Sequence, residues 1–214
     1  STLHPFRENF HSWVTGRGGY QHHHMRVREL ADMPLRSDAP SAQQIWEGTL
    51  NIYKSVMPVL DQYDLRVGMH GNDPPVPKIN GVSQVLYNFD AFEKLFTEVP
   101  SKNNCMTFCV GTRYESGEDI FEGIRRFGDK IIHVHFRNVK GTIPVNGEYQ
   151  EVMPDEGDLS MYRVAKALDD VSYQGVIDYD HLNRISTDSP QGREYMAYCV
   201  GHMRGILQSI EAGG

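Results

Sequence analysis

The sequence lacks three features that would place it in a class at once: a long apolar run, a cluster of basic residues, and a set of paired cysteines. No run approaches the roughly 18 apolar residues of a membrane-spanning helix. Residues 1–5 (STLHP) lack the basic and apolar regions of a signal peptide. We therefore expect a soluble, cytoplasmic protein that makes no membrane contact.

The charge balance argues against nucleic acid as a partner. The formal net charge is -7 at pH 7, and the Lys and Arg residues are scattered along the chain rather than grouped in one segment. Binding to a phosphate backbone needs a basic surface, which this pattern does not provide. We expect a small molecule as the partner.

Cysteine is scarce, with only Cys105, Cys109 and Cys199 in the chain. These residues form neither a CxxC pair nor an even disulfide framework, which suits a reducing compartment. A cysteine with a function is then a ligand rather than half of a bridge, and we expect Cys105 and Cys199 in the core. The ten histidines, several of them in tight groups, are where a site is to be sought.

Strand-like and helix-like segments alternate from Ser41 to the C-terminus, a pattern typical of βα units and a parallel sheet. The expected strands are 65–69, 106–110, 131–136 and 176–179, and the expected helices are 45–60, 92–99, 120–127, 161–168 and 192–212. Four strands are half of an eight-stranded barrel, which typically needs about 250 residues. We predict an α/β, TIM-barrel-type fold in one domain over residues 1–214, the C-terminal half to two-thirds of a (β/α)8 barrel, with N-terminal strands missing or supplied by another subunit.

The first of these helices carries two signals. Ser41 and Gln44 are spaced as a capping box, in which each side chain accepts from the backbone N–H of the other residue. Apolar residues then recur at helical spacing and predict its buried face: Ile45, Ile52, Val56, Val59 and Leu60.

The first 40 residues are irregular. We expect a strand near 11–14 and a glycine-rich turn at 16–19. Three consecutive histidines, 22–24, cannot all serve one compact site, because consecutive side chains diverge in any regular structure. We interpret them as a solvated loop from which one histidine reaches a substrate.

Each predicted strand ends in a residue type that binds metals: His70, Cys109, then His133 and His135, then Asp180 with His181. The carboxyl ends of parallel barrel strands meet on one face, so these residues are expected to converge. Two imidazoles, one thiolate and one carboxylate suit a borderline divalent ion such as Mn²⁺, Fe²⁺ or Zn²⁺.

Strand alternation places His133, His135 and Arg137 on one face of their segment. If that face lines the barrel interior, His135 is a ligand, and the planar fork of Arg137 is suited to a substrate carboxylate. Each residue also has an ordinary structural interpretation: a hydrogen-bonded histidine, a core cysteine, a helix cap at Asp180, or a surface ion pair at Arg137. The recurrence at four successive strand ends favours a site.

Four ordered segments resemble the mannonate dehydratase family: His70–Pro75 (HGNDPP), Phe108–Thr112 (FCVGT), His135–Val139 (HFRNV) and Asp180–His181. The resemblance implies a TIM-barrel lyase that uses Mn²⁺ or Fe²⁺ to dehydrate D-mannonate to 2-keto-3-deoxy-D-gluconate in hexuronate breakdown. The similarity extends from Trp13 through Gly205.

The resemblance also implies residue roles. The metal ligands would be His70, Cys109, His135 and Asp180, with His181 beside the metal as acid or base. A C-terminal tyrosine acts in the family, and Tyr198 is the nearest match, with Tyr195 as the alternative. The remaining roles fall on Arg137 in catalysis and on Asp73, Asn138 and Arg17 in substrate binding.

This chain departs from the family at one loop. The family usually shows His-Pro-Asp-Asp-Pro-Pro where this chain has Gly71 and Asn72 after His70, which removes one carboxylate and a rigid proline. This departure leaves the exact sugar acid open.

Two alternatives stay open. One is a xylose-isomerase-like sugar isomerase or epimerase, which also places metal-binding residues at strand ends, although the thiolate disfavours it because hard-metal isomerase sites prefer carboxylates. The other is a truncated barrel without catalysis that serves as a binding module. We also expect a homo-oligomer.

Overall fold

The computed structural model describes residues 10–183 and 186–213. A parallel sheet lies at its centre, formed by β3 (Val67–His70), β6 (Asn104–Cys109), β7 (Ile131–His135) and β10 (Val176–Asp178). The strand order is β10-β7-β6-β3, and every neighbouring pair is parallel. All four strands predicted from the sequence are confirmed, with ends shifted by at most two residues.

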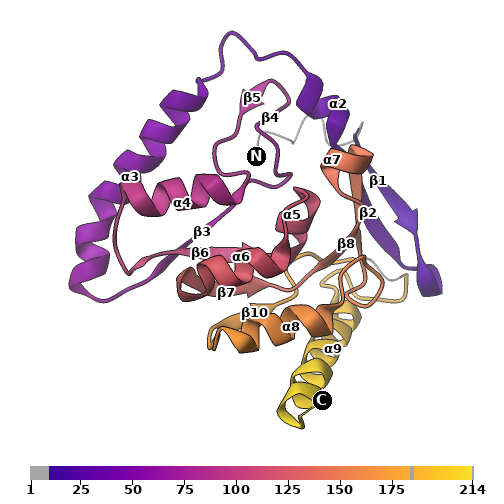
Figure 1. The fold of residues 1–214 in the computed structure, drawn as a ribbon. Helices are drawn as coiled ribbons and strands as arrows, with labels where there is room; N and C mark the ends of the chain where they lie inside the picture. Colours follow the sequence, from indigo (N-terminus) through magenta and orange to yellow (C-terminus); the bar gives the residue numbers. More distant parts are fainter. Residues whose placement is uncertain (1–9, 184–185, 214) are drawn as a thin grey trace.

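Helices and strands alternate as expected. The helices that pack with the sheet are α4 (Phe89–Glu98), α6 (Ile120–Phe127), α8 (Met161–Asp170) and α9 (Arg193–Glu211) (Figure 1). Strand alternation directs the fully buried side chains of Phe108 and Val134 into this core. The next residues on the same strands, Cys109 and His135, therefore face the other side of the sheet.

The long helix α3 (Ala42–Gln62) begins at the predicted capping box, with both Ser41–Gln44 hydrogen bonds present. Its predicted buried face is wrong for three residues, because Ile52, Val56 and Val59 are exposed. The buried face instead consists of Trp46, Leu50, Tyr53 and Met57, which pack with Leu86 and Leu95. Aliphatic residues recur at helical spacing on both faces of α3, and the two aromatic residues mark the face that is buried.

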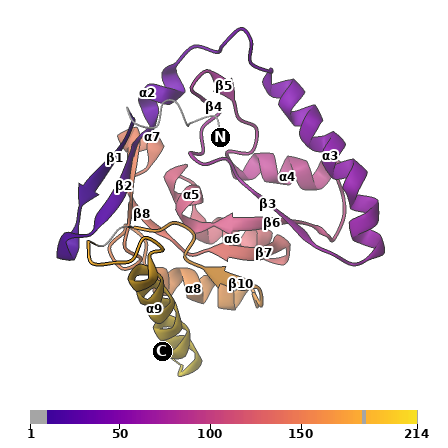
Figure 2. The same ribbon diagram turned by 180° about the vertical axis from the view of Figure 1, so that it is seen from behind.

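A second, antiparallel sheet contains β1 (His11–Thr15), β2 (Gln21–Arg26), β9 (Glu148–Val152) and β8 (Asn138–Lys140), in that order. It lies on the opposite side of the molecule from α3 in both views (Figures 1 and 2). The strand expected near 11–14 is confirmed. The loop expected at 22–24 is wrong, because β2 pairs with both β1 and β9 and so satisfies its backbone on both edges.

Shorter elements complete the described chain. They are η1 (Arg17–Gly19), α2 (Val27–Asp32), β4 (Lys78–Ile79), β5 (Val82–Ser83), α5 (Val110–Glu115), η2 (Gly128–Lys130) and α7 (Ile143–Asn146). Helix α5 begins directly after β6, so Val110 is helical rather than the end of a strand. No helix in the described ranges is both long enough and apolar enough to cross a membrane.

The arrangement is an open segment of a barrel rather than a closed one. Among the described residues, β3 and β10 are the outer strands of the parallel sheet. The carboxyl ends of all four strands lead toward the antiparallel sheet, since β8 follows β7 directly and pairs with β9. The side chains at these strand ends are therefore enclosed between the two sheets.

Candidate metal centre

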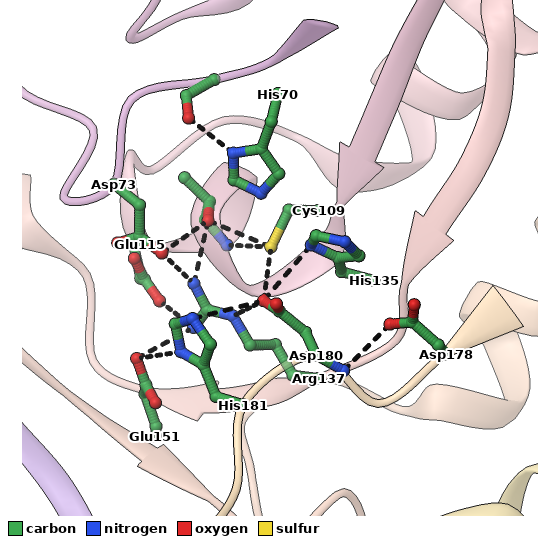
Figure 3. Close-up of polar contacts among 12 residues, drawn as sticks. His70, Asp73, Cys109, Glu115, His135, Arg137, Glu151, Asp178, Asp180 and His181 are labelled. Atoms are coloured by element: carbon green, nitrogen blue, oxygen red, sulfur yellow. Dashed lines mark hydrogen bonds and ion pairs between the residues drawn. The ribbon is translucent and has the colours of Figure 1, made fainter. Parts of the chain in front are cut away.

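Four side chains converge at the carboxyl ends of the parallel strands (Figure 3). His70, Cys109 and His135 are the last residues of β3, β6 and β7, and Asp180 follows β10 by two residues. One ligand atom from each lies within 4.8 Å of those of the other three. The convergence predicted for these four residues is therefore present in the fold.

Cys109 is held at the junction of β6 and α5. Its Sγ accepts hydrogen bonds from the Thr112 backbone N–H at 3.4 Å and from the Thr112 hydroxyl at 3.0 Å. Burial alone would raise the pKa of the Cys109 thiol. The positive charge of Arg137 and the two neighbouring imidazoles outweigh burial and lower this pKa to about 5. The sulfur is thus a thiolate at neutral pH, the form that binds metals.

The two histidines are oriented toward the sulfur. Nδ1 of His70 donates to the carbonyl of Gly71 at 2.6 Å, which leaves Nε2 as the ligand atom of that ring. Nδ1 of His135 is buried, has no hydrogen-bond partner among the described atoms, and lies 3.3 Å from Oδ2 of Asp180. Burial lowers the pKa of His135, but Asp180 and Cys109 more than offset this and raise it to about 10.

Asp180 sits in a left-handed backbone conformation, with φ of 62°, that few residues adopt. Its backbone N–H donates to Oδ1 of Asp178 at 3.0 Å, and this bond helps to fix the turn. Its Oδ2 lies 3.8 Å from the Cys109 sulfur. Burial raises the pKa of the Asp180 carboxyl, but His135, His181 and Arg137 hold it well below its usual range.

These donors fit a divalent metal. A thiolate, a carboxylate and two imidazoles around one point are a set that borderline ions such as Zn²⁺, Fe²⁺ and Mn²⁺ accept. The buried Nδ1 of His135 makes no hydrogen bond and faces the Asp180 carboxylate at 3.3 Å, so a cation at this point would satisfy it. The two imidazoles lie close to the Asp180 carboxylate, and the pKa of the Cys109 thiol is lowered. The cluster is therefore built from charged and polar groups rather than from apolar packing.

Arg137 occupies a different position from the one predicted. All three of its nitrogens are engaged within the chain: Nε with Asp180 at 3.1 Å, Nη1 with Glu115 at 2.5 Å, and Nη2 with Asp73 at 2.6 Å. The residue is 4% exposed. A side chain at Gly111 would come within 2.7 Å of Nη1, so the glycine makes room for the guanidinium. Arg137 therefore positions the carboxylates, and its predicted role as a clamp for the substrate carboxylate is wrong.

His181, predicted as the acid or base, lies beside the cluster. Its Nδ1 is 2.9 Å from Oε1 of Glu151, and its Nε2 is 3.6 Å from Oδ2 of Asp180. Burial lowers the pKa of His181, but the Glu151 carboxylate outweighs this and raises it. Burial raises the pKa of Glu151, and Arg137 together with His181 lowers it to about 2. The carboxylate of Glu151 thus favours the protonated form of the His181 imidazole, next to the four candidate ligands.

A cavity of about 480 Å³ opens over this group. Asp73 faces it, and its Oδ1 accepts from the Tyr149 hydroxyl at 3.2 Å. The lining residues come from both sheets and the loops between them: His11, His23, Met25, Asp73, Pro74, Tyr149, Glu151, Asp180, His181 and Leu182. The predicted substrate residue Asp73 is therefore at the cavity, although one of its oxygens is taken by Arg137.

Two other predicted residues lie elsewhere. The amide of Asn138 is 1% exposed and is fully used by the backbone of Val139, Pro154 and Leu159, so its predicted contact with substrate is wrong. Arg17 forms a bidentate pair with Asp155 and reaches the Tyr198 hydroxyl at 3.4 Å.

Neither candidate tyrosine contacts the four ligands in the described structure. Tyr198 stacks on His202 of the same helix, and the Tyr195 hydroxyl accepts from the Asn183 amide at 3.2 Å in a buried cluster with Cys199. The structure therefore groups Tyr198 with Arg17 and Asp155 rather than with the metal centre. Cys105 and Cys199 are both fully buried, as predicted.

The departure at Gly71 and Asn72 has a structural explanation. The Asn72 side chain accepts from the Leu86 backbone N–H at 2.8 Å, and the Asn72 N–H donates to the Leu86 carbonyl at 2.7 Å. A side chain at Gly71 would come within 2.8 Å of the Arg113 guanidinium. Asn72 thus anchors the loop to the backbone of Leu86 and does not line the cavity, whereas Asp73 does.

Several site residues escaped prediction: Thr112, Glu115, Tyr149, Glu151 and Asp178. Tyr149 and Glu151 are two residues apart on β9, so their side chains share one face of the strand. This two-residue spacing is visible in the sequence. Glu115 lies six residues after Cys109 on α5, a helix that was not expected. The role of its buried carboxylate follows only from the structure, in which Arg137 is also buried and forms an ion pair with it.

Comparisons with known proteins agree with this geometry. The family model for D-mannonate dehydratase (UxuA) matches residues 22–213. A mannonate dehydratase of Oceanobacillus iheyensis is 30% identical over 173 residues, which are 79% of this chain and 49% of that protein. The chain spans about half the length of the curated relatives that it matches.

Two solved structures share the fold. A mannonate dehydratase from Streptococcus suis serotype 2 superimposes with a TM-score of 0.80 at 22% identity, covering 92% of this chain and 60% of that one. A xylose isomerase domain protein from Planctomyces limnophilus gives a TM-score of 0.59 at 16% identity, covering 84% of this chain and 58% of that one. These likenesses confirm the predicted partial barrel of TIM type.

The two cysteines of β6 offer a matched test of the metal centre. Cys109→Ala is expected to abolish stoichiometric binding of a divalent metal, because it removes the only thiolate among the four candidate ligands. Cys105→Ala changes a buried residue of the same strand and should retain the metal. Elemental analysis after gel filtration measures both variants, and full metal content in Cys109→Ala would exclude this centre.

Arg137→Met tests the carboxylate network. Removing the guanidinium leaves several buried carboxylates without a counter-charge, so we expect the free energy of unfolding to fall by about 3–5 kcal/mol. The exposed Arg17–Asp155 pair is the control, and Arg17→Met should cost at most about 1 kcal/mol. Urea denaturation of the two variants measures the difference, and equal losses would contradict the central role of Arg137.

Proposed function

Because the chain belongs to the D-mannonate dehydratase family, we propose that it forms the metal-binding part of an enzyme that dehydrates D-mannonate to 2-keto-3-deoxy-D-gluconate. The reaction class is that of a carbon–oxygen hydro-lyase. The observation that carries the proposal is the cluster of His70, Cys109, His135 and Asp180 beside a cavity that also holds His181. In breakdown of hexuronates, this step removes one water from a sugar acid.

The chemistry requires two proton transfers and a stabilised charge. A weakly acidic proton next to the substrate carboxylate must leave, and the departing hydroxyl must be protonated. A divalent ion held by the four ligands would act as a Lewis acid toward the charge that builds on the carboxylate. We propose Mn²⁺ or Fe²⁺ for this role, because the thiolate and imidazoles disfavour hard ions such as Mg²⁺.

His181 is placed to move one of these protons. Its ring faces the cavity, its Nδ1 is held by Glu151, and its Nε2 points toward Asp180. The raised pKa of the imidazole keeps a proton available for the departing hydroxyl. We therefore assign His181 as the general acid. Asp73, across the same cavity, can accept a hydrogen bond from a substrate hydroxyl.

Arg137 contributes to the reaction indirectly. It orients Asp180 through Nε and fixes Asp73 through Nη2, so a metal ligand and a substrate-facing carboxylate share one rigid support. Support of this kind raises the precision of the site without any contact between Arg137 and substrate.

Two expectations remain proposals. The free cysteines of the chain agree with a reducing, cytoplasmic location. The exposed apolar side chains of α3, among them Ile52 and Val59, agree with a covering partner such as a second subunit or the rest of a barrel.

Turnover tests the proposed function directly. The protein loaded with Mn²⁺ or Fe²⁺ is expected to form a 2-keto acid from D-mannonate, and not to convert aldoses to ketoses. His181→Gln should lower kcat by about 10²- to 10⁴-fold at unchanged metal content, because a positioned acid contributes about that much. His24→Gln, which alters a histidine on β2 that bonds Ser12, is the control.

Aldose isomerisation without keto-acid formation would favour the isomerase alternative. Stoichiometric metal with no turnover of any hexonate or aldose would favour a binding module.

A further inference from the structure

The site lacks an obvious partner for the anionic, hydroxyl-rich end of a sugar acid. The guanidinium of Arg137 is fully engaged, and three carboxylates face the cavity: Asp73, Glu151 and Asp180. Among the described residues that line this cavity, none is a lysine or an arginine. Beyond the metal, the side-chain donors among these lining residues are imidazoles and the Tyr149 hydroxyl. Tyr149 already donates to Asp73, and His181 is already held by Glu151.

The hairpin of β1 and β2 supplies part of the lining of this cavity. Register pairs His11 with Met25 and Trp13 with His23, so these four side chains share one face of the hairpin. His11, His23 and Met25 line the cavity over the metal centre. The other face carries His24, which pairs with Glu148.

The cavity continues past His23. A second cavity of about 540 Å³ is lined by Trp13 and His23 of the hairpin and by Leu182, Asn183, Asp188, Ser189, Pro190 and Gly192. His23 and Leu182 border both cavities, so the two adjoin at these residues. Each volume falls within the range of about 300–1,000 Å³ typical of small-molecule sites.

The rings of His11, Trp13 and His23 pack together on this face of the hairpin. The ring centroids of Trp13 and His23 are 4.0 Å apart, and those of His11 and His23 are 4.5 Å apart. The imidazoles of His11 and His23 are in direct hydrogen-bond contact. Trp13 nevertheless remains 37% exposed. His11, Trp13 and His23 thus form a packed aromatic cluster that solvent still reaches at Trp13; we call it the wall.

We propose that Trp13 and His23 form the substrate-contacting wall of the site and help to select a linear polyhydroxy carboxylate. An imidazole N–H can donate to a carboxylate or hydroxyl oxygen, and an indole offers a flat apolar surface to the C–H edges of a carbon chain. Met25 pairs with Tyr149, so His23 lies next to Glu151 on the same face of the antiparallel sheet. His181 lines the same cavity, so a ligand there contacts both the wall and His181. This inference rests on the proposed function and adds two specificity-determining residues to it.

Binding of a hexonate tests the wall without turnover. Isothermal titration of D-gluconate into the Mn²⁺-loaded protein is expected to show affinity at least tenfold weaker in His23→Ala and in Trp13→Ala than in the unaltered chain. Trp13→Phe should recover part of the loss, because it restores an aromatic face. His24→Ala, on the other face of the same strand, should stay within twofold, and all variants should retain stoichiometric Mn²⁺.

Three results would overturn the wall. They are affinities within twofold in both His23→Ala and Trp13→Ala, loss of Mn²⁺ in either of these variants, or no gluconate binding by the unaltered chain. Failure of the wall and failure of the lyase proposal are distinguishable. Keto-acid formation with unaffected hexonate binding in the variants rejects only the wall, whereas wall-dependent binding without keto-acid formation rejects only the lyase.

Discussion

The buried guanidinium of Arg137 is the interaction on which the site depends. It joins carboxylates from four separate parts of the chain: Asp73 after β3, Glu115 on α5, Glu151 on β9, and Asp180 after β10. Carboxylates this close would repel one another in a low-dielectric interior without a shared counter-charge. With Arg137 in place, the parallel sheet, helix α5 and the antiparallel sheet are tied at one point, and the metal ligands are held beside it.

The sequence predicted the parallel strands and the convergence of four metal-competent side chains because both follow from short-range rules. Apolar segments flanked by helices predict buried strands, and parallel strands bring their carboxyl ends together whatever the distance in sequence. His70, Cys109 and His135 end their strands, so their convergence needed no further information. Asp180 was predicted by the same rule, although in the structure it follows its strand by two residues in a left-handed turn.

The remaining features depend on contacts between segments that are distant in sequence. The role of Arg137 could not be predicted, because a strand-end arginine that binds a substrate and one that binds internal carboxylates have the same local sequence. The polar segment containing His22 resembles a loop, yet β9, more than 120 residues away, pairs with it as a strand. The buried face of α3 was misassigned because both of its faces carry apolar residues, and only the packing of Trp46 and Tyr53 on β3 and α4 distinguishes them.

The central claim is that one thiolate and two imidazoles bind the same cation. X-ray absorption at the metal edge of the Mn²⁺- or Fe²⁺-loaded chain measures this directly. The structure predicts one sulfur neighbour and two imidazole neighbours, with oxygen completing the shell, and the sulfur contribution should vanish in Cys109→Ser. A shell of oxygen and nitrogen alone in the unaltered chain would contradict it.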